Sequence, residues 1–173
     1  MSRLRRPFLY DRYIFATVCL LKSRTKLREG DFERLADALA RMRSKHGFGL
    51  TAWAFLPDHW HAIIYSPHPL SISRGLQAVK VSSTIAINLG RREAGELWQG
   101  RFFDRALRTV KEYGETVEYI HLNPVRRGLV RTPQEWKWSS VHEYSGARGE
   151  EQKRRCGLCI DRPRLPADER ARI

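Results

Sequence analysis

The chain has 173 residues, of which 42% are hydrophobic, enough for one domain with a buried core. No segment approaches the roughly 20 consecutive apolar residues that a membrane span requires, and the basic N-terminus lacks a signal-peptide core, so we expect a cytoplasmic protein without a membrane partner. Lys and Arg number 32 against 19 Asp and Glu, a formal net charge of +13. This surplus favours nucleic acid as the partner and predicts association with the nucleoid.

The first predicted elements are a strand and a helix. Residues 12–21 are rich in β-branched and aromatic side chains, which indicates a buried strand. Asp31 precedes a helix, and Gly47 is its expected stop. The buried side of this helix is marked by apolar residues at helical spacing, namely Phe32, Leu35, Leu39 and Met42.

A hairpin and a second helix follow. Residues 50–56 and 59–66 predict two strands, and the turn between them begins at Pro57. Ser71 is the expected N-cap of the second helix, and residues 98–108 predict a further strand or a bent hairpin. The buried side of the second helix is marked by Ile72, Leu76, Val79, Ser83 and Ala86.

A third helix is predicted over residues 110–122. It should stop near Asn123, because Pro124 disfavours helical geometry in the residue before it. The resulting order, β-α-β-β-α-β-α, indicates an α+β fold in which helices pack on an antiparallel sheet of the ferredoxin-like kind.

The sequence divides into residues 1–10, a basic N-terminal arm, residues 11–144, the folded domain, and residues 145–173, a basic and partly disordered tail. In the tail, Cys156 and Cys159 have half of a zinc-knuckle spacing with no second pair, which favours reduced thiols. We place Lys80 opposite the apolar side of the second helix. The candidate phosphate contacts are basic residues along the chain: Arg3, Arg5, Arg6, Lys80, Arg126, Arg127 and Arg131.

Aromatic residues supply candidate contacts to unpaired bases. Trp98, Phe102 and Phe103 either stack on bases or pack in the core. Strand alternation does not allow all three side chains to be in the core.

Two histidines suggest a metal site. In a strand, residues i and i+2 point to the same face, so His59 and His61 point together, while Trp60 and its alternate neighbours point to the apolar side. Two neutral imidazoles can share one divalent cation, with a third ligand from elsewhere. The alternative is an ordinary pair of half-exposed residues on a sheet.

Periodicity separates the two tyrosines of the third helix. Tyr113 belongs to an apolar stripe and is expected in the core, whereas Tyr119 and Asn123 fall on a polar stripe. Tyr119 is either an ordinary half-exposed residue or a nucleophile. A tyrosine hydroxyl needs a base or a metal for that role, and a metal beside it permits cleavage of a phosphodiester through a covalent intermediate. Asn123 is either the third metal ligand, a residue that orients water, or a helix-ending residue.

These residues resemble a known family. His59-Trp60-His61 resembles the His-hydrophobe-His motif of single-tyrosine transposases that act on single-stranded DNA. The segments 97–105, 119–130 and 136–140 are similar to motifs of the REP-associated tyrosine transposases. The likeness covers roughly residues 10–144, and several motifs in one register make it specific.

The resemblance implies an HUH-endonuclease fold and an enzyme that cleaves and rejoins single-stranded DNA at hairpin-forming palindromic repeats. His59 and His61 would bind Mg²⁺ or Mn²⁺, and Tyr119 would form a 5′-phosphotyrosine intermediate and leave a free 3′-OH. Asn123 stands where related transposases often have a Gln that binds the metal.

Two other functions remain open from the residues. One is a non-catalytic protein that binds nucleic-acid hairpins, and the other is a metal-dependent nuclease that activates water. The compact spacing of the motifs favours a monomer over a homodimer.

Overall fold

The computed structural model describes residues 12–67, 71–145 and 158–163. The elements follow the order predicted from the sequence, with two short additions after the third helix. They are β1 (Arg12–Cys19), α1 (Glu29–His46), β2 (Gly49–Phe55), β3 (His59–Ser66), α2 (Ile72–Arg91), β4 (Phe103–Ala106), α3 (Val110–Arg126), a 3₁₀ turn (Pro133–Glu135) and α4 (Val141–Tyr144).

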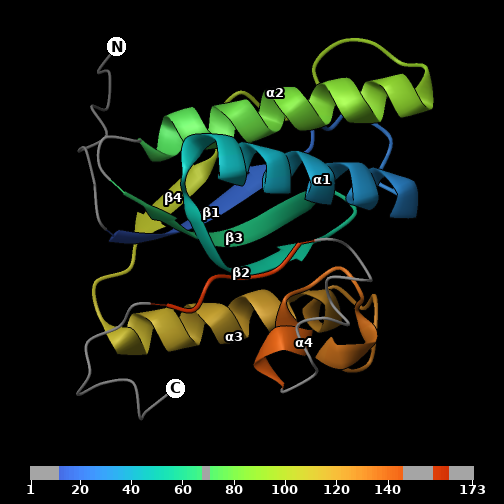
Figure 1. Cartoon of the computed structure of the whole chain (residues 1–173). Coiled ribbons are helices and arrows are strands. Elements are labelled where there is room, and N and C mark those ends of the chain that lie inside the picture. The colour runs from blue at the N-terminus through green and yellow to red at the C-terminus, as the bar shows by residue number, and fades with distance from the viewer. Residues whose placement is uncertain (1–11, 68–70, 146–157, 164–173) are drawn as a thin grey trace, which may run out of the picture.

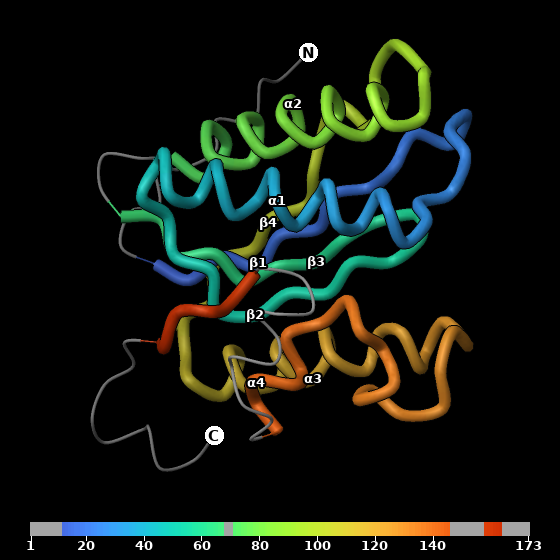
Figure 2. The backbone as a smooth tube through the Cα atoms, turned by 45° about the vertical axis from the view of Figure 1, so that its right-hand side comes forward, coloured from blue at the N-terminus to red at the C-terminus, as the bar shows by residue number. Residues whose placement is uncertain are grey.

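The strands form one four-stranded sheet in the order β2-β3-β1-β4, and all the neighbouring pairs are antiparallel. Helices α1 and α2 cover one face of this sheet, and α3 and α4 lie on the other (Figure 1). The turned view in Figure 2 shows the same three layers. This order and the β-α-β-β-α-β connection confirm the predicted ferredoxin-like α+β fold.

Strand alternation places different side chains of β3 on the two faces of the sheet. Trp60, Ala62 and Ile64 of β3 are buried in the core beneath α1 and α2. His59 and His61 alternate with them and therefore point to the opposite face, where α3 packs. The sheet thus presents both imidazoles to the helix that carries the candidate tyrosine.

The third helix runs past its predicted end. It continues through Pro124 to its last turn, so the expected stop near Asn123 is wrong. The actual stop is Gly128, whose φ of +67° favours glycine and whose N–H donates to the carbonyl of Val125 at 2.9 Å. The N–H of Leu129 donates to the carbonyl of Pro124 at 3.0 Å, completing a Schellman motif. Asn123 therefore lies on a regular helix, one turn beyond the candidate nucleophile.

Lys80 lies on the buried side of α2, so its predicted position opposite the apolar side of the helix is wrong. Lys80 is only 7% exposed, and its Nζ donates to the carbonyls of Gln99 at 2.7 Å and Gly100 at 2.9 Å. Burial lowers the pKa of the Lys80 ammonium. Lys80 thus supports the segment before β4, and we do not retain it as a phosphate contact.

Lys80→Met should lower the free energy of unfolding by about 1–3 kcal/mol, because two carbonyl groups lose their donor while the aliphatic volume is kept. Urea denaturation followed by tryptophan fluorescence measures this change. Lys22→Met, at an exposed lysine, is the matched control and should leave stability unchanged. Equal stability of Lys80→Met and the wild type would contradict the structural role.

The three aromatic residues predicted either to stack on bases or to pack in the core differ in their burial. Trp98 is buried, and its Nε1 donates to Ser83 Oγ at 2.9 Å. Phe102 is half-buried against the core, whereas Phe103 is 57% exposed at the start of β4. The strand in this region is much shorter than residues 98–108. Of the three aromatic residues, Phe103, the first residue of β4, is the one whose ring is largely exposed to solvent.

The outer edge of β2 is covered by two later segments of the chain. The N–H of Phe55 donates to the carbonyl of Trp138 at 2.9 Å, and the N–H of Asp161 donates to the carbonyl of Leu50 at 2.6 Å. These hydrogen bonds pair backbone groups of β2 that would otherwise be open to pairing with another strand. The packed part of the chain therefore extends beyond the predicted boundary at residue 144.

Several predictions concern residues that the structure does not describe. Arg3, Arg5 and Arg6 of the basic arm lie outside the described residues, as do Cys156 and most of the C-terminal tail. In the described ranges, no helix is long and apolar enough to cross a membrane.

Candidate active site

The two histidines of β3 meet on the face of the sheet that α3 covers. Their Nε2 atoms are 3.1 Å apart, and their rings are inclined at 75°. His59 is 5% exposed and His61 is 3% exposed, so this is a buried pair rather than a half-exposed one. Two ring nitrogens at this separation can share either a proton or a cation.

Each imidazole is oriented by a hydrogen bond at its other nitrogen. His59 Nδ1 lies 2.6 Å from Asp58 Oδ1, and His61 Nδ1 lies 2.8 Å from Thr17 Oγ1. Thr17 is the residue opposite His61 in the β1–β3 ladder. With Nδ1–H donated to these oxygens, the lone pairs on Nε2 are directed toward each other, as in histidines that bind metal.

The environment also sets the charge of these groups. Burial, together with the charges of His59 and Arg127, lowers the pKa of His61 to about 3, so its imidazole is neutral near pH 7. Burial opposes ionisation of Asp58, but the hydrogen bond to His59 and the nearby Arg127 charge lower the pKa of its carboxyl. The site therefore combines the neutral imidazole of His61 with the anionic carboxylate of Asp58, which contacts the imidazole of His59.

Asn123 supplies a further polar group at the histidine pair. Its Nδ2 lies 3.1 Å from His61 Nε2, and its Oδ1 is buried without a hydrogen-bond partner. A half-turn of the amide exchanges the two atoms and directs the oxygen toward the imidazoles. In the described part of the chain no third His, Cys, Asp or Glu joins the pair. Two imidazoles and an amide oxygen fit a divalent cation that keeps some positions for water or phosphate.

Tyr119 stands beside this group and is partly exposed. Its ring centroid lies 5.4 Å from that of His61, and 37% of the residue is accessible. Tyr113, six residues earlier on α3, is only 1% exposed, and its hydroxyl lies 3.0 Å from that of Tyr144. The predicted distinction between the two tyrosines is confirmed as far as burial is concerned.

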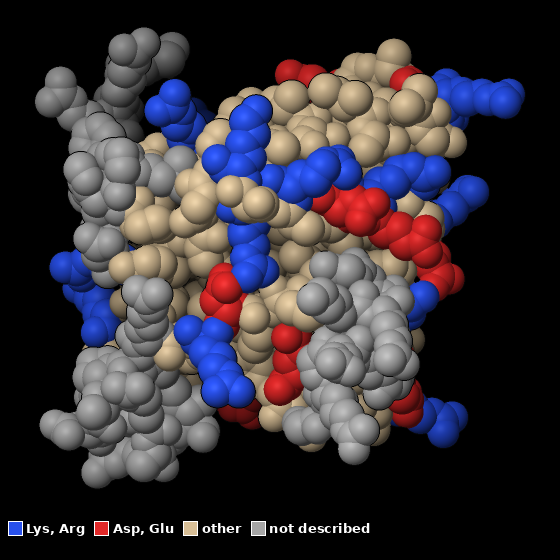
Figure 3. Space-filling view, in the orientation of Figure 1, with Lys and Arg blue, Asp and Glu red and all other residues tan. Residues whose placement is uncertain are grey.

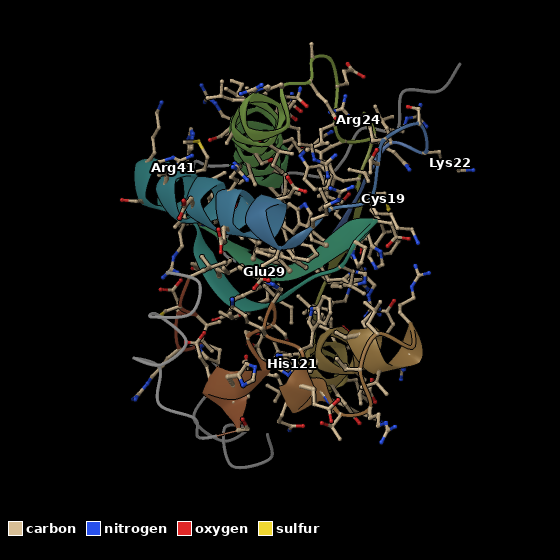
Figure 4. All side chains as sticks on the ribbon, turned by 90° about the vertical axis from the view of Figure 1, so that its right-hand side faces the viewer. Cys19, Lys22, Arg24, Glu29, Arg41 and His121 are labelled. Carbon is tan, nitrogen blue, oxygen red and sulfur yellow. The ribbon has the colours of Figure 1, made fainter. Side chains whose placement is uncertain are left out.

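An open cleft of about 640 Å³ joins the histidines and Tyr119. Lys22, Lys26 and Arg127 also line it, which gives the cleft a cationic rim. Figure 4 shows Lys22 extending into solvent beyond Cys19, at the point where β1 leaves the sheet. A cationic, open cleft is suited to a phosphate backbone.

Two arginines at the end of α3 flank the candidate nucleophile. The Arg126 guanidinium lies 5.3 Å from the centroid of the Tyr119 ring, and Arg127 Nη2 lies 3.9 Å from Asp58 Oδ2. By contrast, the face in Figure 3 shows Lys and Arg side chains interspersed with acidic ones. The placement of Arg126 and Arg127 at the site is therefore more informative than the net charge.

Sequence reasoning missed the residues that support the histidines and the cleft. Thr17, Lys22 and Asp58 were not among the predicted site residues. The register of β1 against β3 would have singled out Thr17, because the residue opposite His61 shares its face. The signal for Asp58 was its position next to His59.

Comparison with known proteins identifies the family of the chain. The family described as "Transposase IS200 like" matches residues 10–123. The REP-associated tyrosine transposase of Escherichia coli K12 is 32% identical over 143 residues, covering 82% of this chain and 84% of the relative.

Solved structures agree with the sequence comparison. A REP-associated tyrosine transposase bound to a REP hairpin matches with a TM-score of 0.73 and 30% identity, covering 83% of this chain and 84% of that one. A crystal structure from Deinococcus radiodurans R1, with 17% identity and a TM-score of 0.50, covers 69% of this chain and 95% of its own and shows likeness of fold alone. Because the family match spans more than half of the chain and the Escherichia coli relative matches most of its length, the chain belongs to the IS200-like transposases and, within them, to the REP-associated tyrosine transposases, enzymes that cleave and transfer single-stranded DNA.

Proposed function

We propose that this transposase cleaves and rejoins single-stranded DNA at hairpin-forming repeats, through a metal-dependent 5′-phosphotyrosine intermediate on Tyr119. The observation that carries the proposal is the position of Tyr119, whose ring lies 5.4 Å from that of His61 in an open cleft with a cationic rim. The similar structure bound to a REP hairpin supports the choice of substrate.

His59, His61 and Asn123 would hold Mg²⁺ or Mn²⁺ through their Nε2 atoms and amide oxygen. When bound, such a cation withdraws charge from a phosphate oxygen and from the departing 3′-oxygen. The residues that contact the Nδ1 atoms hold the imidazoles in position for this role. Thr17 and Asp58 fix the ring orientations, so little reorganisation is needed at the reaction.

The chemical step assigned to the chain's own residues is an attack by Tyr119 Oη on phosphorus. A bond from Oη to phosphorus forms, the bond from phosphorus to the 3′-oxygen breaks, and the tyrosine proton is lost as the 3′-oxygen gains one. The products are a 5′-phosphotyrosine and a free 3′-OH. Rejoining is the reverse attack by a 3′-OH. The nearby Arg126 favours the developing negative charge on the tyrosine oxygen.

Basic residues around the cleft would hold the strand. Arg127 lines the cleft beside Asp58, while Lys22 and Lys26 extend the rim along the loop after β1. The predicted contacts of the N-terminal arm through Arg3, Arg5 and Arg6 remain part of this proposal. A chain that binds phosphates in this way should lose affinity steeply as salt is raised.

The function is tested with hairpin oligonucleotides taken from repeats that flank the protein's own gene, labelled at either end and incubated with protein and Mn²⁺. The label at the 3′ end should become attached to protein on a denaturing gel. The 5′-labelled fragment should be free and extendable by a polymerase. Attachment of the 5′ label would contradict the polarity. Cleavage without attachment would favour a nuclease that activates water, and binding without cleavage would favour a non-catalytic hairpin-binding protein.

A further inference from the structure

A second hollow, of about 370 Å³, lies beside Tyr119, between β4 and α3. It shares Phe15, Phe103 and Tyr119 with the catalytic cleft, so the two spaces adjoin each other. The residues that line it are Phe15, Phe103, Arg105, Glu115, Thr116 and Tyr119. A volume of this order suits a single small organic group.

Phe103 is the unusual member of this lining because its large apolar side chain is 57% exposed. It lies on β4, the edge strand of the sheet, opposite Thr17 of the histidine site. Its ring meets Phe15 edge-on with centroids 6.0 Å apart, and Phe15 in turn meets Tyr119 edge-on at 5.9 Å. The buried Phe15 thus contacts two partly exposed rings, and all three rings line the hollow.

Polar and charged groups complete the lining. Arg105 Nη2 donates to Thr116 Oγ1 at 3.2 Å, and Thr116 Oγ1 donates to the carbonyl of Glu112 at 2.6 Å. The single bond to Thr116 fixes one corner of an exposed guanidinium, which has further N–H groups for an acceptor. An aromatic face next to a fixed guanidinium is the combination that binds a nucleobase and its phosphate.

We propose that this hollow is a subsite for one unpaired nucleobase of the substrate strand, stacked on Phe103, with Arg105 contacting the base edge or the adjacent phosphate. The inference rests on the proposed function, because continuity with the catalytic cleft is what makes the occupant a nucleotide next to the cleaved bond. A paired base cannot use the site, since both of its faces are already stacked in the duplex. The subsite would thus select unpaired DNA at the cleavage position.

The test measures binding rather than cleavage, so that it stands apart from the chemistry. In the Tyr119→Phe protein, the affinity for a hairpin with a single-stranded extension is compared with that for the same DNA made abasic at one position at a time. One position next to the cleavage site should lose about tenfold in affinity. Phe103→Ala in the same protein should lose a similar factor on intact DNA, and no more when that position is abasic. Phe103→Trp should restore the affinity.

Leu89→Ala is the matched control, because Leu89 is an exposed apolar residue of α2, on the opposite face of the sheet, and its loss should leave binding unchanged. Two outcomes would overturn the subsite: additive effects of Phe103→Ala and abasic substitution at every position, or a dimer in sedimentation that Phe103→Ala dissociates. A third outcome is cleavage of DNA by the wild type without a covalent adduct, while Phe103→Ala and the abasic substitution still have non-additive effects on affinity. In that case the proposed chemistry is wrong and the subsite is retained.

Discussion

Tyr119→Phe should abolish cleavage of hairpin DNA while leaving DNA binding close to that of the wild type. The substitution removes only the hydroxyl that would attack phosphorus, and the ring keeps its contacts with Phe15 and His61. Loss of a covalent nucleophile costs on the order of 10⁶-fold in rate in well-characterised enzymes, so we expect no product above background. Single-turnover cleavage with Mn²⁺ and a binding titration on the same oligonucleotide measure the two effects separately.

Tyr113→Phe provides a matched control on the same helix. The Tyr113 hydroxyl is buried and bonded to that of Tyr144, away from the cleft. Its removal should cost about 1 kcal/mol of stability and leave the cleavage rate unchanged. Equal cleavage by Tyr119→Phe and the wild type would rule out Tyr119 as the nucleophile.

His61→Ala should remove metal-dependent cleavage altogether, and His59→Ala should do the same. Each substitution deletes one imidazole from the two histidines and one amide that meet at this site in the described part of the chain. Titration of the protein with Mn²⁺, followed by paramagnetic resonance, should show loss of the bound ion. Hairpin binding at fixed salt should persist, because the cationic rim is unchanged.

Two further variants separate a metal role from a packing role. Thr17→Val keeps the shape of the residue but deletes the bond to His61 Nδ1, and it should weaken metal binding by roughly 10–100-fold. His121→Gln changes another buried histidine, which bonds Ser140 rather than the site, and should leave metal affinity unaltered. Full activity of His59→Ala and His61→Ala in excess chelator would exclude the metal site.

Most of the fold followed from local patterns. The alternation in residues 59–66 correctly placed Trp60 in the main core and both histidines on the other face. The order of strands and helices was enough to predict the antiparallel sheet. These features depend on side-chain periodicity, which a sequence displays directly.

The errors arose where tertiary structure overrides a local preference. Pro124 weakens a helix, but the stop is made by Gly128 and its Schellman bonds, so α3 continues. Lys80 looked like a surface cation, yet the segment after α2 brings to it the carbonyls of Gln99 and Gly100, 19 and 20 residues further along the chain. Neither partner could be foreseen without the fold.

The site was predictable in its main residues and not in its setting. The spacing of His59 and His61 and the polar stripe bearing Tyr119 and Asn123 identified groups that the structure brings together. The contact of Thr17 with His61, the lysines on the rim and the exposure of Phe103 depend on how β1, β3 and β4 are aligned. That alignment is set by long-range packing rather than by any short motif.

The most direct test of the central claim is to locate the covalent bond. Protein incubated with Mn²⁺ and cleavable hairpin DNA is digested with nuclease and protease, and the peptides are examined by mass spectrometry. A nucleotide attached to the peptide at Tyr119 through a phosphodiester, absent from Tyr119→Phe and present in Tyr113→Phe, is the predicted result. Cleaved DNA with every tyrosine unmodified, or with the nucleotide on another residue, would contradict the assignment.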